Sequence, residues 1–462
     1  MALFLLTFLC LYGGINFYFF FRARAVLHFS GILQAIALLS LVLLIVAPIL
    51  VRVLEALHYE TLARTVACIG YVWMAFVFTF FFLSLSLECI RVVHKLIVPD
   101  ASTIAFKAAT FSLAVFLSAV LVIYGYFDAQ HIRLKHLQIE TSAALPENGR
   151  LRIVQISDVH IGIIIRNSRL DPVLEKIREV KPDMLVSTGD LLDGELDNIM
   201  NDAERFAAIE TPYGKFAVLG NHEYYAGLRR SIEFTEAAGF RLLRDEWIEA
   251  AGITIFGEDD ITGRRPGQTA QSASFQKALA EAREGFVLLL KHQPYIDQDA
   301  RFHLQLSGHT HGGQLFPFGL FTKIYFPRNY GLHDLASGKQ LYISRGAGTW
   351  GPPVRVFAPQ RITRDKVNGE LVDGVLIQFL IRVRDVAAPG DKYVSSSPLK
   401  GIISRVFEKG EEPTSEDGKQ VDYIMSPLSI VSRMTTDVFL SLWSNAVLVG
   451  LKERVLEVYQ SE

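Results

Sequence analysis

Cysteine is almost absent from this chain, and so is any large excess of one charge. The three cysteines, Cys10, Cys68 and Cys89, all lie near the start of a 462-residue sequence. The rest of the chain therefore holds neither a disulfide framework nor a thiolate metal site, and any metal there needs nitrogen and oxygen ligands. The formal net charge is -2, which lacks the strongly basic balance typical of nucleic-acid binding, so we expect no nucleic-acid partner.

The composition is intermediate between that of a soluble protein and that of a membrane protein. Half of the residues are hydrophobic, 20% are charged, and the mean hydropathy is +0.27. The chain is too apolar for an ordinary soluble protein and too charged for a pure membrane bundle. Its length allows two or three domains, because folded units usually contain about 100–200 residues. We therefore expect a membrane part and a globular part.

Charged side chains are missing from four long segments near the start. These segments are 1–21, 25–51, 65–87 and 108–127. Each can span a membrane, because about 20 apolar helical residues cross the hydrocarbon core. The first segment lacks the basic start of a signal peptide and ends in Phe20, Phe21 and Arg22 rather than in small residues. We predict a transmembrane helical domain of four spans over residues 1–130, in a multi-pass membrane protein.

Lysine and arginine in the loops indicate orientation, because cytoplasmic loops carry the excess of these residues. Four spans place the N-terminus and everything after residue 127 on the same side. The first and third loops carry five basic residues, against four on the opposite side. The five are Arg22, Arg24, Arg91, Lys95 and Lys107, and the four are Arg52, Arg64, Arg133 and Lys135. This margin of one residue predicts an extracytoplasmic globular domain.

The pattern changes to short apolar runs that alternate with helical stretches over residues 148–365. The predicted strands are 151–156, 184–187, 216–219, 253–256, 286–290 and 354–357. Asp171 and Pro172 read as the N-cap and first residue of a helix that runs to Val180. The alternation indicates an α/β domain. We assign residues 366–462 to a C-terminal extension with a strand at 375–381, a linker, and an interfacial or packing helix at 438–451.

Polar clusters follow the ends of the predicted strands. They are Asp158-Val159-His160, Gly189-Asp190, Gly220-Asn221-His222-Glu223, His292, and Gly308-His309-Thr310-His311. Taken singly, an aspartate after a strand is more often a turn or a helix cap, and a lone histidine is usually a satisfied polar residue. The carboxyl ends of strands in α/β sheets face the ligand crevice, however, so these side chains should converge. So many aspartate, asparagine and histidine side chains at successive strand ends indicate a functional site.

The chemistry of these side chains points to metal ions. Imidazole and carboxylate without thiolate suit Zn, Mn, Fe or Ni. Two such ions about 3.5–4 Å apart would need a bridging carboxylate. Asp190 occupies the middle of the set, and we expect it to form that bridge.

The order of these motifs resembles the calcineurin-like metallophosphoesterase superfamily, over about Leu151 to Gly313. The motifs that carry the resemblance are Asp-x-His, Gly-Asp-x-x-Asp, Gly-Asn-His-Glu, His and Gly-His-Thr-His. Gly312-Gly313-Gln314 with Pro317, and the Gly-x-Gly-Thr-Trp-Gly-Pro-Pro run from Gly346 with Arg355, resemble its bacterial membrane-associated branch. The resemblance implies a four-layer αββα sandwich, here preceded by the all-α transmembrane bundle.

The resemblance also implies a role for each motif residue. It implies that Asp158, His160 and His311 hold one divalent metal ion, that Asn221, His292 and His309 hold a second, and that Asp190 lies between them. His222 falls where the family has a proton donor for the leaving group rather than a ligand. Asp193 completes Gly-Asp-x-x-Asp and is expected either to support the site or only to fix the loop. Glu223, Asp259 and Asp260 receive no role.

The leading function is hydrolysis of a phosphomonoester, phosphodiester or pyrophosphate by a membrane-anchored, metal-dependent phosphoesterase. Because the site is tethered at a bilayer, we expect a substrate attached to lipid or envelope components. The alternative is a membrane sensor or scaffold that binds a phosphorylated ligand without turnover, although the ligand set is complete. A transporter or channel would need ionisable residues inside its spans, and apart from Cys and Tyr these contain only His28.

Overall fold

The computed structural model describes most of the first 383 residues and short pieces of the remainder. The described residues are 2–97, 103–141, 150–166, 169–194, 199–264, 285–296, 301–335, 338–356, 376–383, 392–394, 400–402, 405–407, 411, 413–415 and 454. They divide into two compact units, Met1–Val383 and Arg384–Glu462. Each unit is described by itself.

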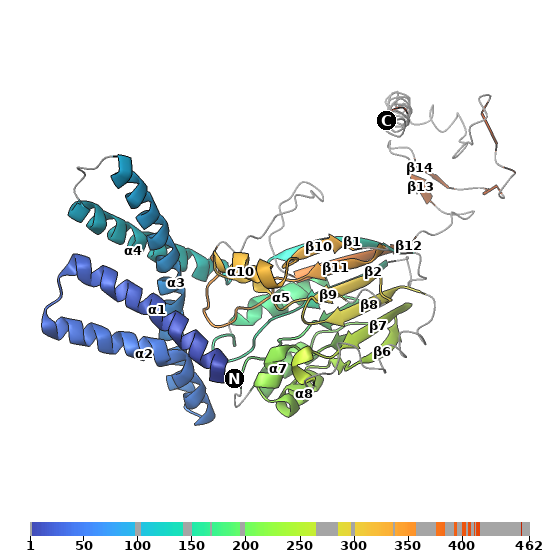
Figure 1. Ribbon diagram of the computed structural model, residues 1–462. Helices are drawn as coiled ribbons and strands as arrows, with labels where there is room; N and C mark the ends of the chain where they lie inside the picture. The colour runs from blue at the N-terminus through green and yellow to red at the C-terminus, as the bar shows by residue number, and fades with distance from the viewer. Residues whose placement is uncertain are drawn as a thin grey trace. The chain divides into compact units, whose positions relative to one another are not determined.

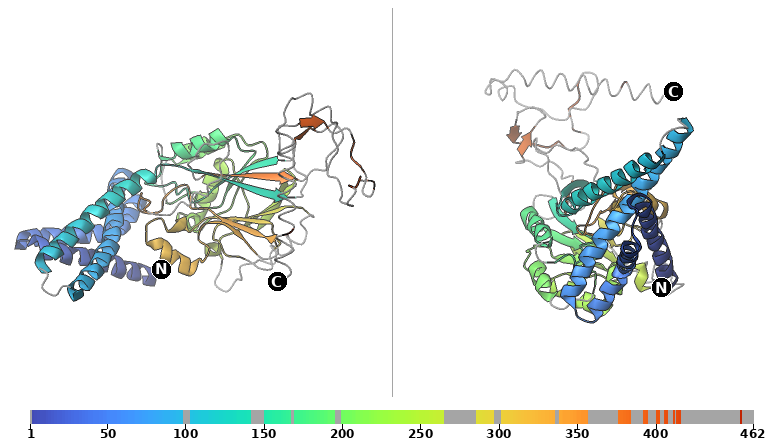
Figure 2. Two further views of the ribbon diagram at one scale, coloured as in Figure 1. Left: turned by 90° about the horizontal axis from the view of Figure 1, so that it is seen from above. Right: turned by 90° about the vertical axis from the view of Figure 1, so that its left-hand side faces the viewer.

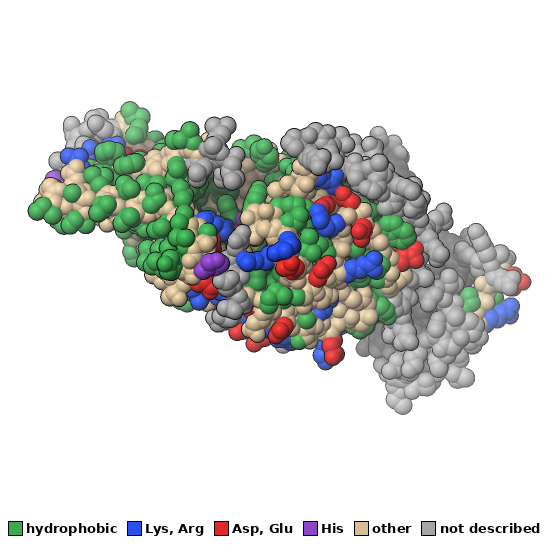
Figure 3. Space-filling model, turned by 90° about the horizontal axis from the view of Figure 1, so that it is seen from below, with side chains coloured by type: hydrophobic (Ala, Val, Ile, Leu, Met, Phe, Trp, Pro, Cys, Tyr) green, Lys and Arg blue, Asp and Glu red, His purple; other side chains and the backbone are tan. Residues whose placement is uncertain are grey.

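Four long helices open the first unit, as the four uncharged segments predict (Figure 1). They are α1 (Ala2–Leu27), α2 (Gly31–Ala56), α3 (Glu60–Ile97) and α4 (Thr103–Asp128). All four are long and apolar enough to cross a membrane. Hydrophobic side chains gather on this part of the molecule, whereas charged side chains are frequent over the sheets (Figure 3). The prediction of an all-α bundle of four apolar helices is confirmed.

Aromatic rings hold the helices together. The Phe19 ring on α1 meets the rings of Trp73 and Phe80 on α3 edge to face, with centroids 5.2 and 5.0 Å apart. Asn16, which is fully buried, accepts a hydrogen bond from the Trp73 indole at 2.7 Å and donates to the carbonyl oxygen of Tyr12 at 2.8 Å. No polar group of Asn16 is therefore left facing hydrocarbon, where it would be costly.

Two six-stranded mixed sheets follow the helices. The first has the order β1-β12-β2-β3-β4-β5, and the second has the order β10-β11-β9-β8-β7-β6. The strands of the first sheet are β1 (Leu134–Thr141), β2 (Arg150–Ile156), β3 (Met184–Ser187), β4 (Lys215–Ala217), β5 (Arg241–Leu242) and β12 (Leu376–Val383). Those of the second are β6 (Glu246–Ala250), β7 (Ile253–Glu258), β8 (Val287–Lys291), β9 (Leu304–Ser307), β10 (Gly331–Asp334) and β11 (Gln340–Ile343). Strands β2 to β5 run parallel to one another, as do β7, β8, β9 and β11.

The two sheets stack face to face around a shared apolar core (Figure 2). Alternate residues of β2 point to opposite faces. Ile153 packs between the sheets against residues such as Leu288 and Leu304. Val154 points the other way, towards a second core formed with three helices. These helices are α5 (Asp171–Val180), α6 (Met200–Ala207) and α8 (Leu228–Ala237). The predicted α/β sandwich of two sheets is confirmed, and among the described residues α5, α6 and α8 pack on the outer face of the first sheet.

Several predicted elements differ from the structure in position. The strand expected at 375–381 is β12, and it pairs with β1 and β2 in the first sheet. The sheet therefore extends past both predicted domain boundaries, 148 and 365. Over residues 354–356, the part of the predicted strand at 354–357 that the structure describes, no strand forms, and Val356 makes an isolated bridge to Leu315. Asp171 is already helical, and Leu170 is the N-cap of α5.

Short segments carry the described part of the second unit. Strand β13 (Lys392–Val394) pairs antiparallel with β14 (Lys400–Ile402). The helix predicted at 438–451 lies outside the described residues.

The apolar helices contact the sandwich directly within the first unit. The Gly125 carbonyl of α4 accepts a hydrogen bond from the Arg355 backbone nitrogen at 2.9 Å. A Cβ atom at Gly125 would lie 2.4 Å from the Arg355 carbonyl oxygen, so only glycine permits this approach. Ile163, in the loop after β2, packs against Val51 of α2 and Ala67 of α3. The bundle and the sheets therefore share buried surface.

Candidate metal centre

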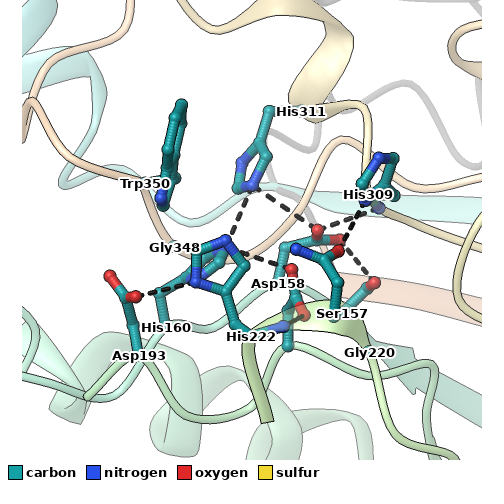
Figure 4. Close-up of polar contacts among 12 residues, drawn as sticks. Ser157, Asp158, His160, Asp193, Gly220, His222, His309, His311, Gly348 and Trp350 are labelled. Carbon is teal, nitrogen blue, oxygen red and sulfur yellow. Dashed lines mark hydrogen bonds and ion pairs between the residues drawn. The ribbon is translucent and has the colours of Figure 1, made fainter. Parts of the chain in front are cut away.

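The predicted metal ligands lie together at the carboxyl ends of strands from both sheets. Figure 4 shows four of them, Asp158, His160, His309 and His311. Five of them have positive backbone φ angles in the left-handed region, which non-glycine residues rarely adopt. They are Asp158 (51°), His160 (53°), Asp190 (53°), His309 (72°) and His311 (49°). Such conformations cost of order 1–3 kcal/mol each and cluster at functional sites. This concentration of backbone strain marks the strand ends as the site.

Asp158, His160 and His311 form one buried group. The Nε2 atoms of His160 and His311 lie 3.0 Å apart, and Nε2 of His311 lies 3.5 Å from Oδ1 of Asp158. The three residues can each offer one ligand atom to a common metal ion. This is the set that the resemblance implies for the first ion.

Asp190, His292 and His309 form a second group that can hold a metal ion. Nε2 of His292 lies 3.2 Å from Oδ2 of Asp190. Oδ1 of Asn221 lies 3.1 Å from Nε2 of His292 and 2.9 Å from Nδ1 of His309. The Nδ1 atom of His292 is 2.8 Å from the Thr188 carbonyl oxygen, so donation to that carbonyl leaves Nε2 facing the site. All the residues implied for the second ion are therefore adjacent.

Glu223, which received no role from the sequence, holds the backbone around Asp190. Its buried carboxylate accepts hydrogen bonds from the backbone nitrogens of Asp190, Leu191, Leu192 and Gly220, at 2.9, 2.5, 3.1 and 2.7 Å. Four N–H donors on one carboxylate tie the loop after β3 to the loop after β4. Glu223 therefore positions Asp190 rather than facing the metal groups.

The glycine-rich run from Gly346 lies against Asp158. The Gly348 nitrogen donates to the Asp158 carbonyl oxygen at 2.9 Å, and a Cβ atom at Gly348 would lie 2.0 Å from the Val159 carbonyl oxygen. Nη2 of Arg355, a buried residue, donates to the carbonyl oxygens of Arg345 and Gly348, each at 2.7 Å. The glycine-rich run therefore packs against the backbone of Asp158 and supports the first ligand group.

Burial keeps three of the imidazoles neutral. It lowers the pKa of His160 to about 4 and that of His309 to about 3. It also holds the pKa of His311 well below its usual value. Neutral imidazole has the free lone pair that a metal ion needs. Among the residues that the structure describes, the buried Nδ1 atoms of His160 and His311 have no hydrogen-bond partner. A buried polar cluster of this kind is costly unless a cation compensates it, and the donor set fits divalent metal ions.

His292 and Asp190 behave as an ion pair in the metal-free protein. Burial alone would lower the pKa of His292, but the Asp190 carboxylate outweighs it and holds that pKa well above its usual value. Burial alone would raise the pKa of Asp190, but His292 and His222 outweigh it and hold that pKa low. Burial also raises the pKa of Asp158 to about 6. A proton on His292 therefore occupies the place of a cation, and a metal ion must displace it.

His222 is held by Asp193, and Asp193 is held by a residue from the helical bundle. Nδ1 of His222 lies 2.8 Å from Oδ1 of Asp193, and Nη2 of Arg52 on α2 donates to the same oxygen at 3.2 Å. Burial alone would lower the pKa of His222, but the charges of Asp190 and Asp193 outweigh it and raise the pKa to about 9. His222 therefore carries a proton at neutral pH in the metal-free protein, as a proton donor requires.

A family model and a similar protein identify the family of this chain. The sequence model of the calcineurin-like phosphoesterase family matches residues 151–313. An uncharacterized metallophosphoesterase of Aquifex aeolicus is 38% identical over 259 residues, which cover 55% of this chain and 99% of that protein. The chain belongs to the calcineurin-like phosphoesterase family. The family implies a phosphoester hydrolase that binds divalent metal ions, and the two ligand groups fit that chemistry.

Other metallophosphoesterase relatives are longer than the matched region. An uncharacterized metallophosphoesterase of Campylobacter jejuni is 35% identical over 48% of this chain and 60% of its own length. A zebrafish (Danio rerio) protein named "Transmembrane protein with metallophosphoesterase domain" is 32% identical over 54% of this chain and 61% of its own. The four apolar helices and such relatives support a membrane protein.

A second family model, that of RNA polymerase Rpb2, domain 6, matches residues 270–455. This match overlaps the metallophosphoesterase match, and strands β8 and β9 within the overlap belong to the second sheet of the sandwich. It therefore assigns no separate function to the chain.

Metal binding should release protons and weaken in acid. A cation that binds at Asp190 must displace the proton of His292, and below pH about 6 it must also displace one from Asp158. We expect affinity to fall about tenfold per pH unit where one proton is displaced, and more steeply below pH about 6. Calorimetric titration of the stripped protein, in buffers of different ionisation enthalpy, measures both effects. Affinity independent of pH between 5 and 8 would contradict this protonation scheme.

Replacing Arg52 by alanine should reduce turnover while the metal ions stay bound. The Arg52 side chain is 50% exposed, and ion pairs of this kind contribute up to about 1 kcal/mol, equivalent to a loss of about fivefold. We expect that loss in kcat for substrates with poor leaving groups, because Asp193 would hold His222 less firmly. Arg64→Ala, on the exposed face of α3, is the matched control for the charge change. An equal loss in both variants would assign the effect to charge alone.

Proposed function

We propose that this chain is a membrane-anchored hydrolase that uses two divalent metal ions to cleave a phosphomonoester, phosphodiester or pyrophosphate bond. The position of Asp190 carries the proposal. Its Oδ2 atom lies 3.8 Å from Nε2 of His160 in one ligand group and 3.2 Å from Nε2 of His292 in the other. A carboxylate shared between two ligand groups supports a bridge between two cations.

Different residues of this chain would bind the metal ions and donate the proton. Asp158, His160 and His311 would hold one cation, Asn221, His292 and His309 the other, and Asp190 both. When bound, the two cations, which we expect to be Mn, Fe, Zn or Ni, supply positive charge that stabilises phosphoryl oxygens and activates water. His222, whose Nδ1 faces Asp193, would give the proton on its Nε2 to the oxygen of the leaving group.

The walls of the site favour a substrate attached to lipid or envelope components. Arg52 of α2 and Tyr71 of α3 line the same cavity as His160 and Asp193. Helices long enough to span a membrane thus contribute side chains beside the metal ligands. A phosphate carried at a membrane surface can reach a cavity with such a wall.

Assays of the metal-loaded, detergent-purified protein test this function. The substrates are phosphomonoesters, phosphodiesters, nucleotide pyrophosphates and phospholipids. We expect metal-dependent turnover of at least one class. A protein that holds two metal ions and binds phosphorylated ligands, but turns over none of them, would instead be a membrane sensor or scaffold.

We also propose that the catalytic domain faces away from the cytoplasm, as the five-to-four excess of basic residues predicts. Outside, it would meet envelope lipids and secreted phosphoesters rather than cytosolic nucleotides. Reporter fusions after Leu137 measure the side directly. We expect an extracytoplasmic reporter to be active there, and a reporter active only in the cytoplasm would overturn both the orientation and the envelope substrate.

A further inference from the structure

Helix α10 (Phe318–Tyr325) exposes an apolar surface although it belongs to the catalytic domain. None of its residues is buried. Its exposed apolar side chains include Leu320 (59%), Ile324 (79%) and Tyr325 (78%). Phe316, just before the helix, is 52% exposed. So many adjacent apolar side chains are unusual on a water-facing surface and mark a site of interaction.

Helix α10 also touches α3 inside its uncharged segment. The Phe318 ring lies 6.1 Å from the Phe78 ring, and the Phe321 ring lies 6.1 Å from the Phe82 ring, centroid to centroid. Phe78 and Phe82 fall well inside residues 65–87, which carry no charge. If that segment crosses the hydrocarbon core, side chains in contact with its middle lie at the depth of the bilayer. The exposed face of α10 then meets lipid rather than water.

Helix α10 is also attached to the loop that carries two metal ligands. A Cβ atom at Gly313 would lie 2.1 Å from Cα of Gly319, so the loop and the helix meet backbone to backbone. Thr310, between His309 and His311, donates its hydroxyl to the Asn329 carbonyl oxygen at 2.5 Å. Directly after α10, the Phe326 ring lies 5.4 Å from the His309 imidazole. Apolar side chains therefore continue from α3 to the metal centre.

We infer that α10 lies in the bilayer beside α3 and binds the acyl chains of a membrane lipid whose phosphate group reaches the metal centre past Phe326. This inference rests on the proposed function and names its substrate class, a phospholipid with long acyl chains. Lipid is the occupant that fits, because the neighbouring surface of α3 is itself apolar and of spanning length. Lys323 and Arg328, both exposed beside the apolar face, suit an anionic head group.

Two measurements test the inference on the full-length, metal-loaded protein in vesicles. The first compares kcat/KM for a dioleoyl phosphomonoester and a dioleoyl phosphodiester with kcat/KM for their deacylated, water-soluble counterparts. Leu320→Gln combined with Ile324→Gln should lower the ratio of lipid to soluble activity by at least about tenfold, because acyl methylenes lose apolar contacts. Met200→Gln combined with Tyr213→Gln, two exposed apolar residues away from the metal centre, is the matched control and should leave the ratio unchanged.

The second measurement does not depend on turnover. Vesicles that contain a phospholipid with a diazirine near the end of its acyl chain are irradiated, and crosslinked peptides are identified by mass spectrometry. We expect lipid adducts in the peptide that contains α10, and fewer in the double glutamine variant. An absence of lipid adducts from the α10 peptide would overturn the inference, as would an unchanged activity ratio.

The outcomes separate this inference from the proposed function. Hydrolysis of the soluble substrates without hydrolysis of their dioleoyl forms would leave the proposed function standing and refute the role of α10. Lipid adducts on α10 without hydrolysis of any phosphoester would refute the proposed function while the contact with lipid remained. A variant that lost both activities equally would show that α10 acts only by supporting His309.

Discussion

Replacing Asp190 by asparagine should abolish binuclear metal binding and phosphoester hydrolysis together. The change removes the negative charge of the Asp190 carboxylate. Its Oδ2 atom lies 3.8 Å from an imidazole nitrogen of one ligand group and 3.2 Å from an imidazole nitrogen of the other. Replacing a residue that only hydrogen-bonds to a metal ligand typically costs about 10–100-fold in metal affinity. We therefore expect metal affinity to fall by more than about a hundredfold when the bridging residue itself is replaced. Elemental analysis of the purified variant, together with turnover measured on the same sample, gives both results.

Asp202→Asn provides the matched control for this substitution. Asp202 is also a buried aspartate, 2% exposed, but it lies on α6 and pairs with Arg205 at 3.2 Å. Its loss should affect folding stability without changing metal content. If Asp190→Asn still held two metal ions tightly and turned over substrate at the normal rate, Asp190 would not be the bridge. If the variant kept one ion, Asp190 would belong to one site alone.

The parts of the fold that the sequence predicted are those with a local hydrophobic signal. Strands β3 and β8 are short runs in which every residue is buried, so they are visible as apolar segments. Strand β5 has only two residues, and β10 alternates between half-buried and exposed positions, so neither leaves a clear pattern. The pairing of β12 with β1 and β2 joins segments far apart in the chain, and no local pattern encodes it.

The residues of the candidate site also differ in whether a local sequence signal predicts them. The proposed ligands were found because each follows a strand end, where side chains from a sheet converge. Glu223 lies two residues after the proposed ligand Asn221, but an acidic residue at that position gives no sign that it accepts backbone N–H groups. Arg52 lies 141 residues from Asp193 in the sequence, at the end of an apolar helix. Only the packing of α2 against the loop after β3 reveals its contact with the site.

Replacing His222 by alanine should keep the metal ions and lose turnover. The backbone nitrogen of His222 donates to Oδ1 of Asp190 at 2.9 Å, and Nδ1 of its ring lies 2.8 Å from Oδ1 of Asp193. The ring also lies edge to face against the His160 ring, with centroids 4.7 Å apart, and the same three side chains, His160, Asp193 and His222, lie close enough to hold a cation. Loss of a general acid typically costs about 10²–10⁴-fold in rate. We expect that loss for an alkyl phosphoester, whose alkoxide needs a proton to depart. For a nitrophenyl ester the loss should be much smaller, because nitrophenolate departs without one.

The dependence on the leaving group separates proton donation from every structural role of His222. A variant with distorted loops or weakened metal binding would lose activity on alkyl and nitrophenyl esters alike, whereas a missing acid affects only the step in which the leaving-group oxygen gains its proton. His303→Ala is the control and should leave both rates unchanged. The His303 ring stacks on the Phe286 ring, with centroids 5.2 Å apart, and this pair lies away from the metal ligands. Equal losses on the two esters, or loss of metal from His222→Ala, would instead make His222 a ligand or a positioning residue, and Asp193 would then support the metal site rather than the acid.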